Sequence, residues 1–391
     1  MIDVRPKKNQ ERALLIGLEQ DGVSKWDLRD SMEELAELAN SAGAEVVNTV
    51  TQKLQKPTAP YYIGKGKAEL IKESFKDQHV TSVIFDDELS PAQGRNLENL
   101  LSRKVLDRTQ LILDIFAQRA RSREGRLQIE LAQLQYLLPR LTRMWTHLSR
   151  QTGGIGTRGP GETQLEVDRR RVQERIARLE RDLEGVRKVR NVQRQGRKRH
   201  QWPVAAVVGY TNAGKSTLLN VLTNSDVRAE QRMFATLDPT SRRLRLPREQ
   251  EIIVNDTVGF IRDLPPGLLS AFRATLEEIG DSRLLIHLVD ISNPRWLQQI
   301  QSVERILEEL KFSQIPSIMT LNKADLVDAE TVQAILRQLS PDGSREVVAI
   351  AATDKKTLPP LLEKVGQMLS KDLSLAGGEQ TFDASRFSRI A

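Results

Sequence analysis

The sequence predicts an α/β protein in three parts: an N-terminal α/β domain, a long antiparallel helical hairpin, and a doubly wound α/β domain built on a phosphate-binding loop. Strand-like and helix-like patterns alternate near both ends of the chain, apolar residues in the middle recur every three or four positions, and a glycine-rich loop follows an apolar strand. The predicted parts are residues 1–115, 116–200 and 201–370, followed by a polar tail over 371–391.

The N-terminal part alternates apolar runs with amphipathic helical patterns, which is typical of α/β domains. Ser90 followed by Pro91 predicts a helix start, because a serine side chain can accept a hydrogen bond from a free helix N–H and proline has a preset φ. Strands are expected over residues 12–17, 45–51 and 81–86, and helices over 31–42, 68–78 and 91–102.

The middle part carries two apolar seams. Apolar residues recur at alternating steps of four and three from Leu127 to Leu148, and the same spacing returns from Val172 to Val186, as in a coiled coil. Residues 151–161 between them hold five glycines and a proline, which helix interiors exclude. We therefore expect an antiparallel hairpin with a glycine-rich connection, and a kink at Pro139 in its first helix.

Positive charge is concentrated in this hairpin. Residues 116–200 hold 21 Lys and Arg against 9 Asp and Glu, a net charge of +12, which leaves −5 on the rest of a chain whose total is +7. A one-signed excess indicates a polyanion such as RNA, although a solvated helix face is the alternative because long helices often carry many charges. The candidate RNA contacts are Arg158, Arg169, Arg170, Arg194, Arg197, Lys198 and Arg199.

Composition excludes several classes of chemistry. The chain has no cysteine, so disulfides, thiolate nucleophiles and cysteine-bound metal centres are excluded. Its four histidines are scattered without the spacing of a metal site. No apolar run approaches the roughly 20 residues that a membrane span needs. These features predict a cytoplasmic protein without a membrane span, and we expect a monomer.

A phosphate-binding loop follows the strand predicted over 204–208. The pattern Gly-x-x-x-x-Gly-Lys-Ser ends at Ser216, and a helix is predicted over 217–222. Glycines let backbone N–H groups surround phosphate oxygens, while Lys215 reaches the β and γ oxygens and the Ser216 hydroxyl binds Mg²⁺. The candidate phosphate-binding residues are Gly209, Tyr210, Thr211, Asn212, Ala213, Gly214, Lys215, Ser216 and Thr217.

Two further motifs follow strands predicted over 251–254 and 316–321. Asp-Thr-Val-Gly supplies a carboxylate for Mg²⁺ through water and a glycine N–H for a γ-phosphate. Asn-Lys-Ala-Asp supplies a carboxylate that, if buried, selects guanine, because adenine lacks the N1–H and N2–H donors. Alone, each motif would fit a turn or a helix start, but in this order they predict a guanine-nucleotide site. The candidate residues are Asp256, Thr257, Val258 and Gly259, with Asn322, Lys323 and Asp325.

At this point the sequence resembles the HflX family of ribosome-associated GTPases, over about residues 12–370. The likeness lies in long motifs that occur in the family's order. These motifs are GGIGTRGPGETQLEVDRRR at Gly153 to Arg171, GYTNAGKST at Gly209 to Thr217, FATLDPT at Phe234 to Thr240, DTVGFIRDLP at Asp256 to Pro265 and NKAD at Asn322 to Asp325, with further likeness at Leu89 to Glu98 and Asp107 to Leu134.

The resemblance implies GTP hydrolysis with Mg²⁺, coupled to binding of the large ribosomal subunit and, in some members, to splitting of stalled ribosomes. It implies that Thr236 joins Ser216 on Mg²⁺ when the γ-phosphate is present. An alternative is an RNA-binding assembly or silencing factor in which GTP is mainly a conformational ligand. The implied switch I residues are Phe234, Ala235, Thr236, Leu237 and Asp238, and the implied backbone contacts to guanine are Ala351, Ala352 and Thr353, where the family's usual serine is missing.

One position departs from the wider GTPase pattern. Phe260 follows Gly259, where many GTPases have the glutamine that orients the attacking water. A phenyl ring cannot accept or orient that proton, so we expect slow intrinsic hydrolysis that a partner, the ribosome, accelerates. Arg262 is a candidate contributor in cis, although a surface arginine is the simpler interpretation.

Overall fold

The computed structural model describes residues 11–22, 25–141, 164–199, 202–223, 233–234, 240–247, 250–262, 276 and 279–376. These residues form two compact units. Unit 1 comprises residues 1–194 with 230–238 and 264–273, and unit 2 comprises 195–229, 239–263 and 274–391. The expected glycine-rich connection at 151–161 and most of the polar tail lie outside the described residues.

Unit 1 is built on a four-stranded parallel sheet in the order β2-β1-β3-β4. Parallel neighbours require crossover connections, and helices supply them. The strand β4 was not predicted, because a run of four residues between two helices carries little periodicity. The elements are β1 (Arg12–Glu19), α1 (Lys25–Ser41), β2 (Glu45–Lys53), α2 (Lys65–Gln78), β3 (Ser82–Phe85), α3 (Pro91–Leu101) and β4 (Lys104–Asp107).

Helices cover both faces of this sheet. Ile71 of α2 and Leu97 of α3 pack with Phe85 of β3 in one buried cluster. α1 packs directly on β1: a Cβ at Gly17 would lie 2.4 Å from Met32 Sδ, so a larger residue there would require the Met32 side chain to move. The predicted helix start is confirmed, since the Ser90 side chain accepts from the Gln93 N–H in a capping box.

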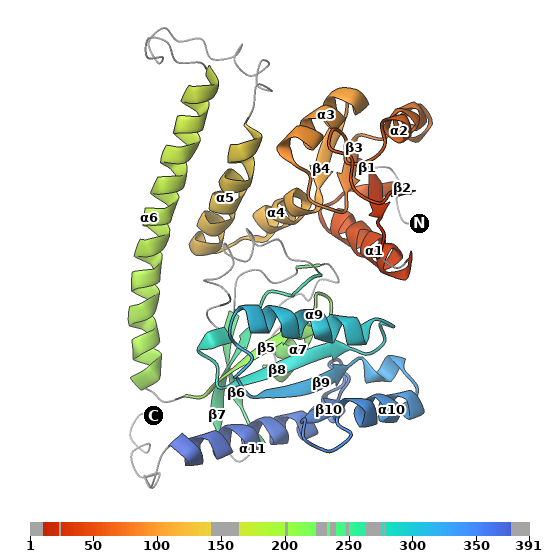
Figure 1. Ribbon diagram of the computed structural model, residues 1–391. Coiled ribbons are helices and arrows are strands. Elements are labelled where there is room, and N and C mark those ends of the chain that lie inside the picture. The colour runs from red at the N-terminus through yellow and green to blue at the C-terminus, as the bar shows by residue number, and fades with distance from the viewer. Residues whose placement is uncertain are drawn as a thin grey trace, which may run out of the picture. The chain divides into compact units, whose positions relative to one another are not determined.

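The hairpin helices run antiparallel, as predicted (Figure 1). Arg175 of α6 donates two hydrogen bonds to the Glu130 carboxylate of α5, at 2.7 and 2.9 Å. A bidentate pair of this kind fixes the two helices against each other. The remaining elements of unit 1 are α4 (Arg108–Arg119), α5 (Arg123–Leu137), the 3₁₀-helix η1 (Leu138–Arg140) and α6 (Gln164–Arg199).

Two details of the predicted hairpin were wrong. α5 buries Ile129 and Ala132, whereas Leu127 on the predicted seam is only half-buried, because α5 also packs against α4 and the buried face turns toward that helix. Pro139 does not kink a continuous helix: α5 ends at Leu137 and proline occupies the first turn of η1, where its missing N–H costs nothing.

Unit 2 contains a six-stranded sheet in the order β10-β9-β8-β5-β7-β6, parallel except for the edge strand β6. The strands predicted over 204–208, 251–254 and 316–321 are β5, β7 and β9, whereas β6 and β10 were not predicted. The elements are β5 (Val204–Gly209), α7 (Lys215–Leu222), β6 (Thr240–Arg245), β7 (Glu251–Asp256), β8 (Leu284–Asp290), α9 (Trp296–Glu309), β9 (Ser317–Asn322), η5 (Ala324–Leu326), α10 (Ala329–Leu339), β10 (Val347–Ala349), η6 (Lys355–Thr357) and α11 (Pro359–Ala376).

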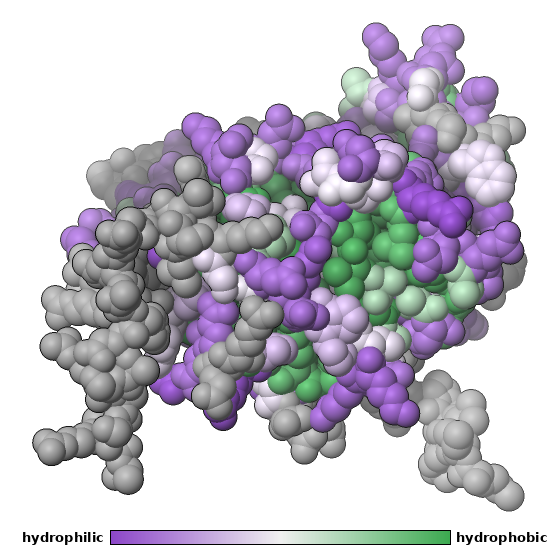
Figure 2. Space-filling model, turned by 90° about the horizontal axis from the view of Figure 1, so that it is seen from below, coloured by the Kyte–Doolittle hydropathy of each residue, from purple (hydrophilic) through white to green (hydrophobic). Residues whose placement is uncertain are grey.

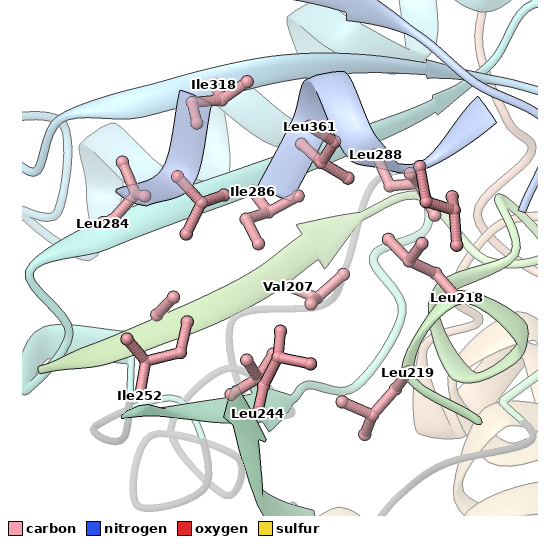
Figure 3. Packing of buried hydrophobic residues seen from close by; sticks show 14 of the residues in the cluster. Val207, Leu218, Leu219, Leu244, Ile252, Leu284, Ile286, Leu288, Ile318 and Leu361 are labelled. Carbon is pink, nitrogen blue, oxygen red and sulfur yellow. The ribbon is translucent and has the colours of Figure 1, made fainter. Parts of the chain in front are cut away.

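This sheet is doubly wound, as predicted. On one face, Leu218 and Leu219 of α7 point toward Val207, and Leu361 of α11 packs toward Ile286 (Figure 3). On the other face, buried residues of α9 and α10 pack against β8 and β9. Burial of a Leu or Ile side chain contributes about 1.5–3 kcal/mol, so these two layers hold the central strands firmly in place.

We expect a His287→Gln variant to lose less stability on acidification than the parent. His287 is 4% exposed in β8, and its burial, with smaller contributions from the positive charges of Arg345 and Lys215, lowers its pKa from 6.5 to about 3. Between these values the unfolded chain binds a proton that the folded chain excludes. The contribution of neutral His287 to the free energy of unfolding is therefore fully present above pH 6.5. It is lost as the pH drops toward 3, by about 1.4 kcal/mol per pH unit for one proton.

Denaturant unfolding of both proteins at pH 7 and pH 5 measures this effect. The free energy of unfolding should fall more steeply in the parent than in the variant. Equal losses in the two proteins would show that His287 does not contribute to the acid sensitivity.

Among the described residues, no helix is both long and apolar enough to cross a membrane. Figure 2 shows hydrophilic side chains over much of the face seen from below, with apolar side chains visible between them.

Candidate nucleotide-binding site

The three predicted motifs lie at one edge of the unit 2 sheet. The phosphate loop follows β5, Asp256 ends β7 and Asn322 ends β9. β5 lies parallel to both β7 and β8, and β8 lies parallel to β9, so the carboxyl ends of all four strands meet at the same edge. Open α/β sheets bind ligands in this position.

Two glycines of the loop have positive φ and lie close to neighbouring atoms, a backbone oxygen at Gly209 and a side-chain amide at Gly214. Gly209 has φ 153°, and a Cβ there would lie 2.3 Å from the carbonyl oxygen of Leu288 in β8. Gly214 has φ 96°, and a Cβ there would lie 2.4 Å from Nδ2 of Asn322. Side chains at these positions would push the loop away from the sheet, so the loop conformation depends on both glycines.

Lys215 begins α7 and is buried within the loop. Its Nζ donates to the carbonyl oxygens of Gly209 at 3.0 Å and Tyr210 at 2.7 Å. Burial lowers the pKa of Lys215 from 10.5 to about 8, and the nearby Asp256 carboxylate opposes that shift. The lysine side chain is thus held beside the backbone N–H groups at the start of α7, where a phosphate would be bound.

Side-chain hydroxyls link the phosphate loop and β5 to the end of β7 by hydrogen bonds. The Ser216 hydroxyl donates to Asp256 Oδ2 at 2.9 Å, and the Thr257 hydroxyl donates to the Val207 carbonyl oxygen at 2.7 Å. Within the described residues no three His, Cys, Asp or Glu side chains form a metal-binding group. A hydroxyl and one carboxylate, completed by water and phosphate oxygens, are instead the hard oxygen donors that suit Mg²⁺.

The segment after Gly259 pairs with the phosphate loop. Phe260 N–H donates to the Gly209 carbonyl oxygen at 3.1 Å, and Thr211 N–H donates to the Phe260 carbonyl oxygen at 2.7 Å. The Phe260 side chain is 3% exposed, so it packs in the interior. Arg262 is partly exposed, and its N–H donates to the Tyr210 hydroxyl at 2.7 Å. This hydroxyl contact was not predicted, since nothing in the motif distinguishes tyrosine at that position.

The described part of the predicted switch I belongs to unit 1. Phe234 is 2% exposed with φ 56°, and its ring lies edge-to-face against Phe116 with centroids 4.5 Å apart. The Met233 N–H donates to the Ser41 hydroxyl at 3.1 Å. The Phe234 ring is thus buried, and the other switch I candidates, Ala235, Thr236, Leu237 and Asp238, lie outside the described residues.

Asn322 joins two loops of the predicted guanine site. Its Nδ2 donates to the Ala213 carbonyl oxygen at 2.7 Å, and its Oδ1 accepts from the Ala352 N–H at 2.9 Å. The neighbouring Lys323 has φ 61° and donates to Asp290 Oδ2 at 2.5 Å. Asn322 thus links the phosphate loop to the loop at 351–353, a role that only the tertiary structure shows.

Asp325 and the 351–353 loop differ in their exposure. Asp325 lies in the short surface helix η5 and is exposed. Two residues of the 351–353 loop, Ala351 and Ala352, are buried, while Thr353 is exposed. The Thr357 hydroxyl accepts from the Ala351 N–H at 3.0 Å and donates to the Ala351 carbonyl oxygen at 2.9 Å. Thr357, which follows this loop in the chain, therefore stabilises its conformation.

Only part of the candidate RNA surface is described. Arg169 and Arg170 are exposed on α6, and Arg170 forms a 4.0 Å ion pair with Glu174. Arg158 lies outside the described residues. The backbone at the end of α6 is described, but the side chains of its candidate residues are not, namely Arg194, Arg197, Lys198 and Arg199.

The class of protein follows from this arrangement. A doubly wound sheet whose first strand leads into the phosphate loop, with Asp256 and Asn322 beside it, is the domain of a P-loop GTPase. Family models match in chain order: "GTP-binding GTPase N-terminal" over residues 29–117, "GTP-binding GTPase Middle Region" over 119–197 and "50S ribosome-binding GTPase" over 204–323.

Individual relatives give the same result. A GTPase HflX of Caldanaerobacter subterraneus subsp. tengcongensis is 48% identical over 93% of this chain and 82% of its own length. The Escherichia coli GTPase HflX is 49% identical over 77% of this chain and 71% of its own length. The crystal structure of the SsGBP and GDP complex is 29% identical, covering 93% of this chain and 100% of that one, with a TM-score of 0.53. The chain belongs to the HflX family and is a GTPase.

Proposed function

We propose that this GTPase uses its nucleotide state to control association with the large ribosomal subunit. One observation supports the nucleotide part: Asn322 holds the phosphate loop to the 351–353 loop, and Ser216 contacts Asp256, so these three motifs lie next to each other. The ribosome part is supported by the 50S-binding family model over residues 204–323 and by the net charge of +12 over 116–200. Because ribosomes are the proposed partner, the proposed location is the cytoplasm.

Within this proposal each part of the site has one task. Backbone N–H groups from Asn212 to Thr217 and the Lys215 ammonium bind the phosphates. Ser216 would hold Mg²⁺, with Asp256 acting through water and Thr236 joining in the GTP state, and the ion would supply positive charge beside the phosphates. Asp325 accepts hydrogen bonds from guanine, and because its carboxylate is exposed, the base itself has to cover it.

Slow intrinsic hydrolysis is part of the same proposal. The Phe260 ring is buried and its backbone is paired with the phosphate loop, so it offers no group that could orient the attacking water. A ribosomal group, or a rearrangement that the ribosome induces, would supply what is missing. The same observation favours the second candidate, an RNA-binding factor in which GTP is mainly a conformational ligand.

GTP turnover measured with and without purified large ribosomal subunits tests the proposal, with ATP as the control substrate. We expect a rise of at least about tenfold with GTP and none with ATP. Retained subunit binding without any rise would favour the RNA-binding candidate. An equal rise with ATP would contradict the assignment of Asp325 as the residue that reads guanine.

A further inference from the structure

The carboxylate of Asp290 contacts the predicted guanine-binding motif from a neighbouring strand. Asp290 ends β8, lies opposite Asn322 of β9 and is 8% exposed. Its Oδ2 accepts from the Lys323 ammonium at 2.5 Å, while its Oδ1 accepts from the Ser292 N–H at 3.0 Å and from the Ser292 hydroxyl at 2.6 Å. Because both carboxylate oxygens are engaged, this side chain has a fixed position and holds the lysine firmly.

Lys323 is the residue at which the chain turns from β9 into η5. Its φ of 61° and ψ of 33° lie in the left-handed region, which is unfavourable for a residue with a Cβ. Such a conformation persists only where surrounding contacts hold it. The Ala324 N–H donates to the Ile350 carbonyl oxygen at 3.1 Å, and the Leu326 N–H donates to the Lys323 carbonyl oxygen at 3.0 Å. These bonds hold the turn by its backbone, and Asp290 holds it by the lysine side chain.

The position of Asp325 depends on this turn. Asp325 is the second residue of η5 and is exposed, so the backbone of the turn, rather than packing around the side chain, determines where its carboxylate lies. A carboxylate that accepts from both N1–H and the 2-amino group of guanine needs a defined direction, because hydrogen bonds weaken steeply when misaligned. The contact that holds Lys323 therefore affects how well Asp325 can meet both donors.

We infer that Asp290 is a positioning residue for guanine recognition: it holds the Lys323 ammonium and thereby fixes the left-handed turn that presents Asp325. The inference rests on the proposed role of Asp325 in binding guanine. Without the negative charge at position 290, Lys323 is less constrained and the Asp325 carboxylate is less well aligned. The loss should be greatest for a base that offers both donors. Inosine diphosphate (IDP) reveals this difference, since its base keeps N1–H and lacks the 2-amino group.

An Asp290→Asn variant tests the inference. The amide keeps the shape of the side chain and one oxygen acceptor for Ser292, which turns its NH₂ group toward the Lys323 ammonium. Titration calorimetry on the full chain, with Mg²⁺, gives the affinities of parent and variant for GDP and IDP. The parent should prefer GDP by roughly 10- to 100-fold, because one hydrogen bond to a charged acceptor separates the two ligands. In the variant this ratio should fall by at least about fivefold, mainly through weaker GDP binding.

Two further variants show whether Asp290 acts through Lys323. Lys323→Met should lower the ratio of GDP to IDP affinity by itself, and adding Asp290→Asn to it should lower the ratio no further. Glu346→Gln is the matched control, because Glu346 pairs with the Lys364 ammonium at 2.5 Å and this variant also loses a lysine–carboxylate contact of unit 2. Its affinities for both nucleotides should equal those of the parent.

The outcomes separate this inference from the proposed function. An unchanged ratio in Asp290→Asn, whether or not both affinities fall, overturns the inference, and so does an equal fall in the parent and in the Lys323→Met background. An unchanged ratio in Lys323→Met alone also overturns it. A parent that binds GDP and IDP equally well overturns the proposed role of Asp325 too.

Discussion

A Gly214→Ala variant is expected to bind GTP at least about 100-fold more weakly than the parent. At φ 96° a side chain is strained by about 1–2 kcal/mol. The new Cβ would also lie 2.4 Å from Asn322 Nδ2, an amide that two hydrogen bonds hold in place. Displacing Asn322 would disrupt the phosphate loop and the 351–353 loop together, at a further cost of about 1–3 kcal/mol for each buried polar group left unpaired.

Gly343→Ala is the matched control for this experiment. Gly343 has φ 71°, but a Cβ there meets nothing within 4 Å. The control therefore carries the backbone strain without the collision, and its GTP affinity should equal that of the parent. Affinities are compared by equilibrium titration with a fluorescent GTP analogue. Normal affinity in Gly214→Ala would show that Asn322 does not position the loop.

A Lys215→Ala variant should lose GTP binding by about 100- to 1000-fold and with it any GTP-dependent association with large subunits. The Lys215 ammonium is buried beside the loop, and removing one charged partner from a buried contact costs about 2–5 kcal/mol. Binding that depends on the arginines of the hairpin should persist, with a steep decrease as salt increases.

Co-sedimentation with large subunits across a salt series, with and without GTP, separates the two candidate functions. Lys356→Ala, an exposed lysine of unit 2, serves as the control and should behave like the parent. If Lys215→Ala and the parent sediment equally in the presence of GTP, nucleotide does not control the association. The RNA-binding candidate would then describe the protein better.

The amino-acid sequence determined the features that depend on short segments. The glycines, Lys215 and Ser216 lie within eight consecutive residues, so their spacing alone predicts a phosphate loop. Ser90 and Pro91 predict a helix start for the same reason, since capping involves atoms only a few residues apart. A strand that is covered by helices on both faces consists of a continuous run of apolar residues. Such runs predicted β5, β7 and β9.

The contacts between segments that are distant in the sequence were determined only by the tertiary structure. Asn322 bonds to residues that are 109 and 30 positions away, and the Tyr210 hydroxyl meets a backbone N–H 52 positions away, so no local pattern encodes either contact. The buried face of α5 depends on its packing against α4 as well as α6, which a heptad pattern does not contain. The ring of Phe234 packs on Phe116 in unit 1, a contact that no local pattern encodes either. Local spacing specifies which groups a site contains, whereas packing between remote segments specifies where those groups point and what they hold.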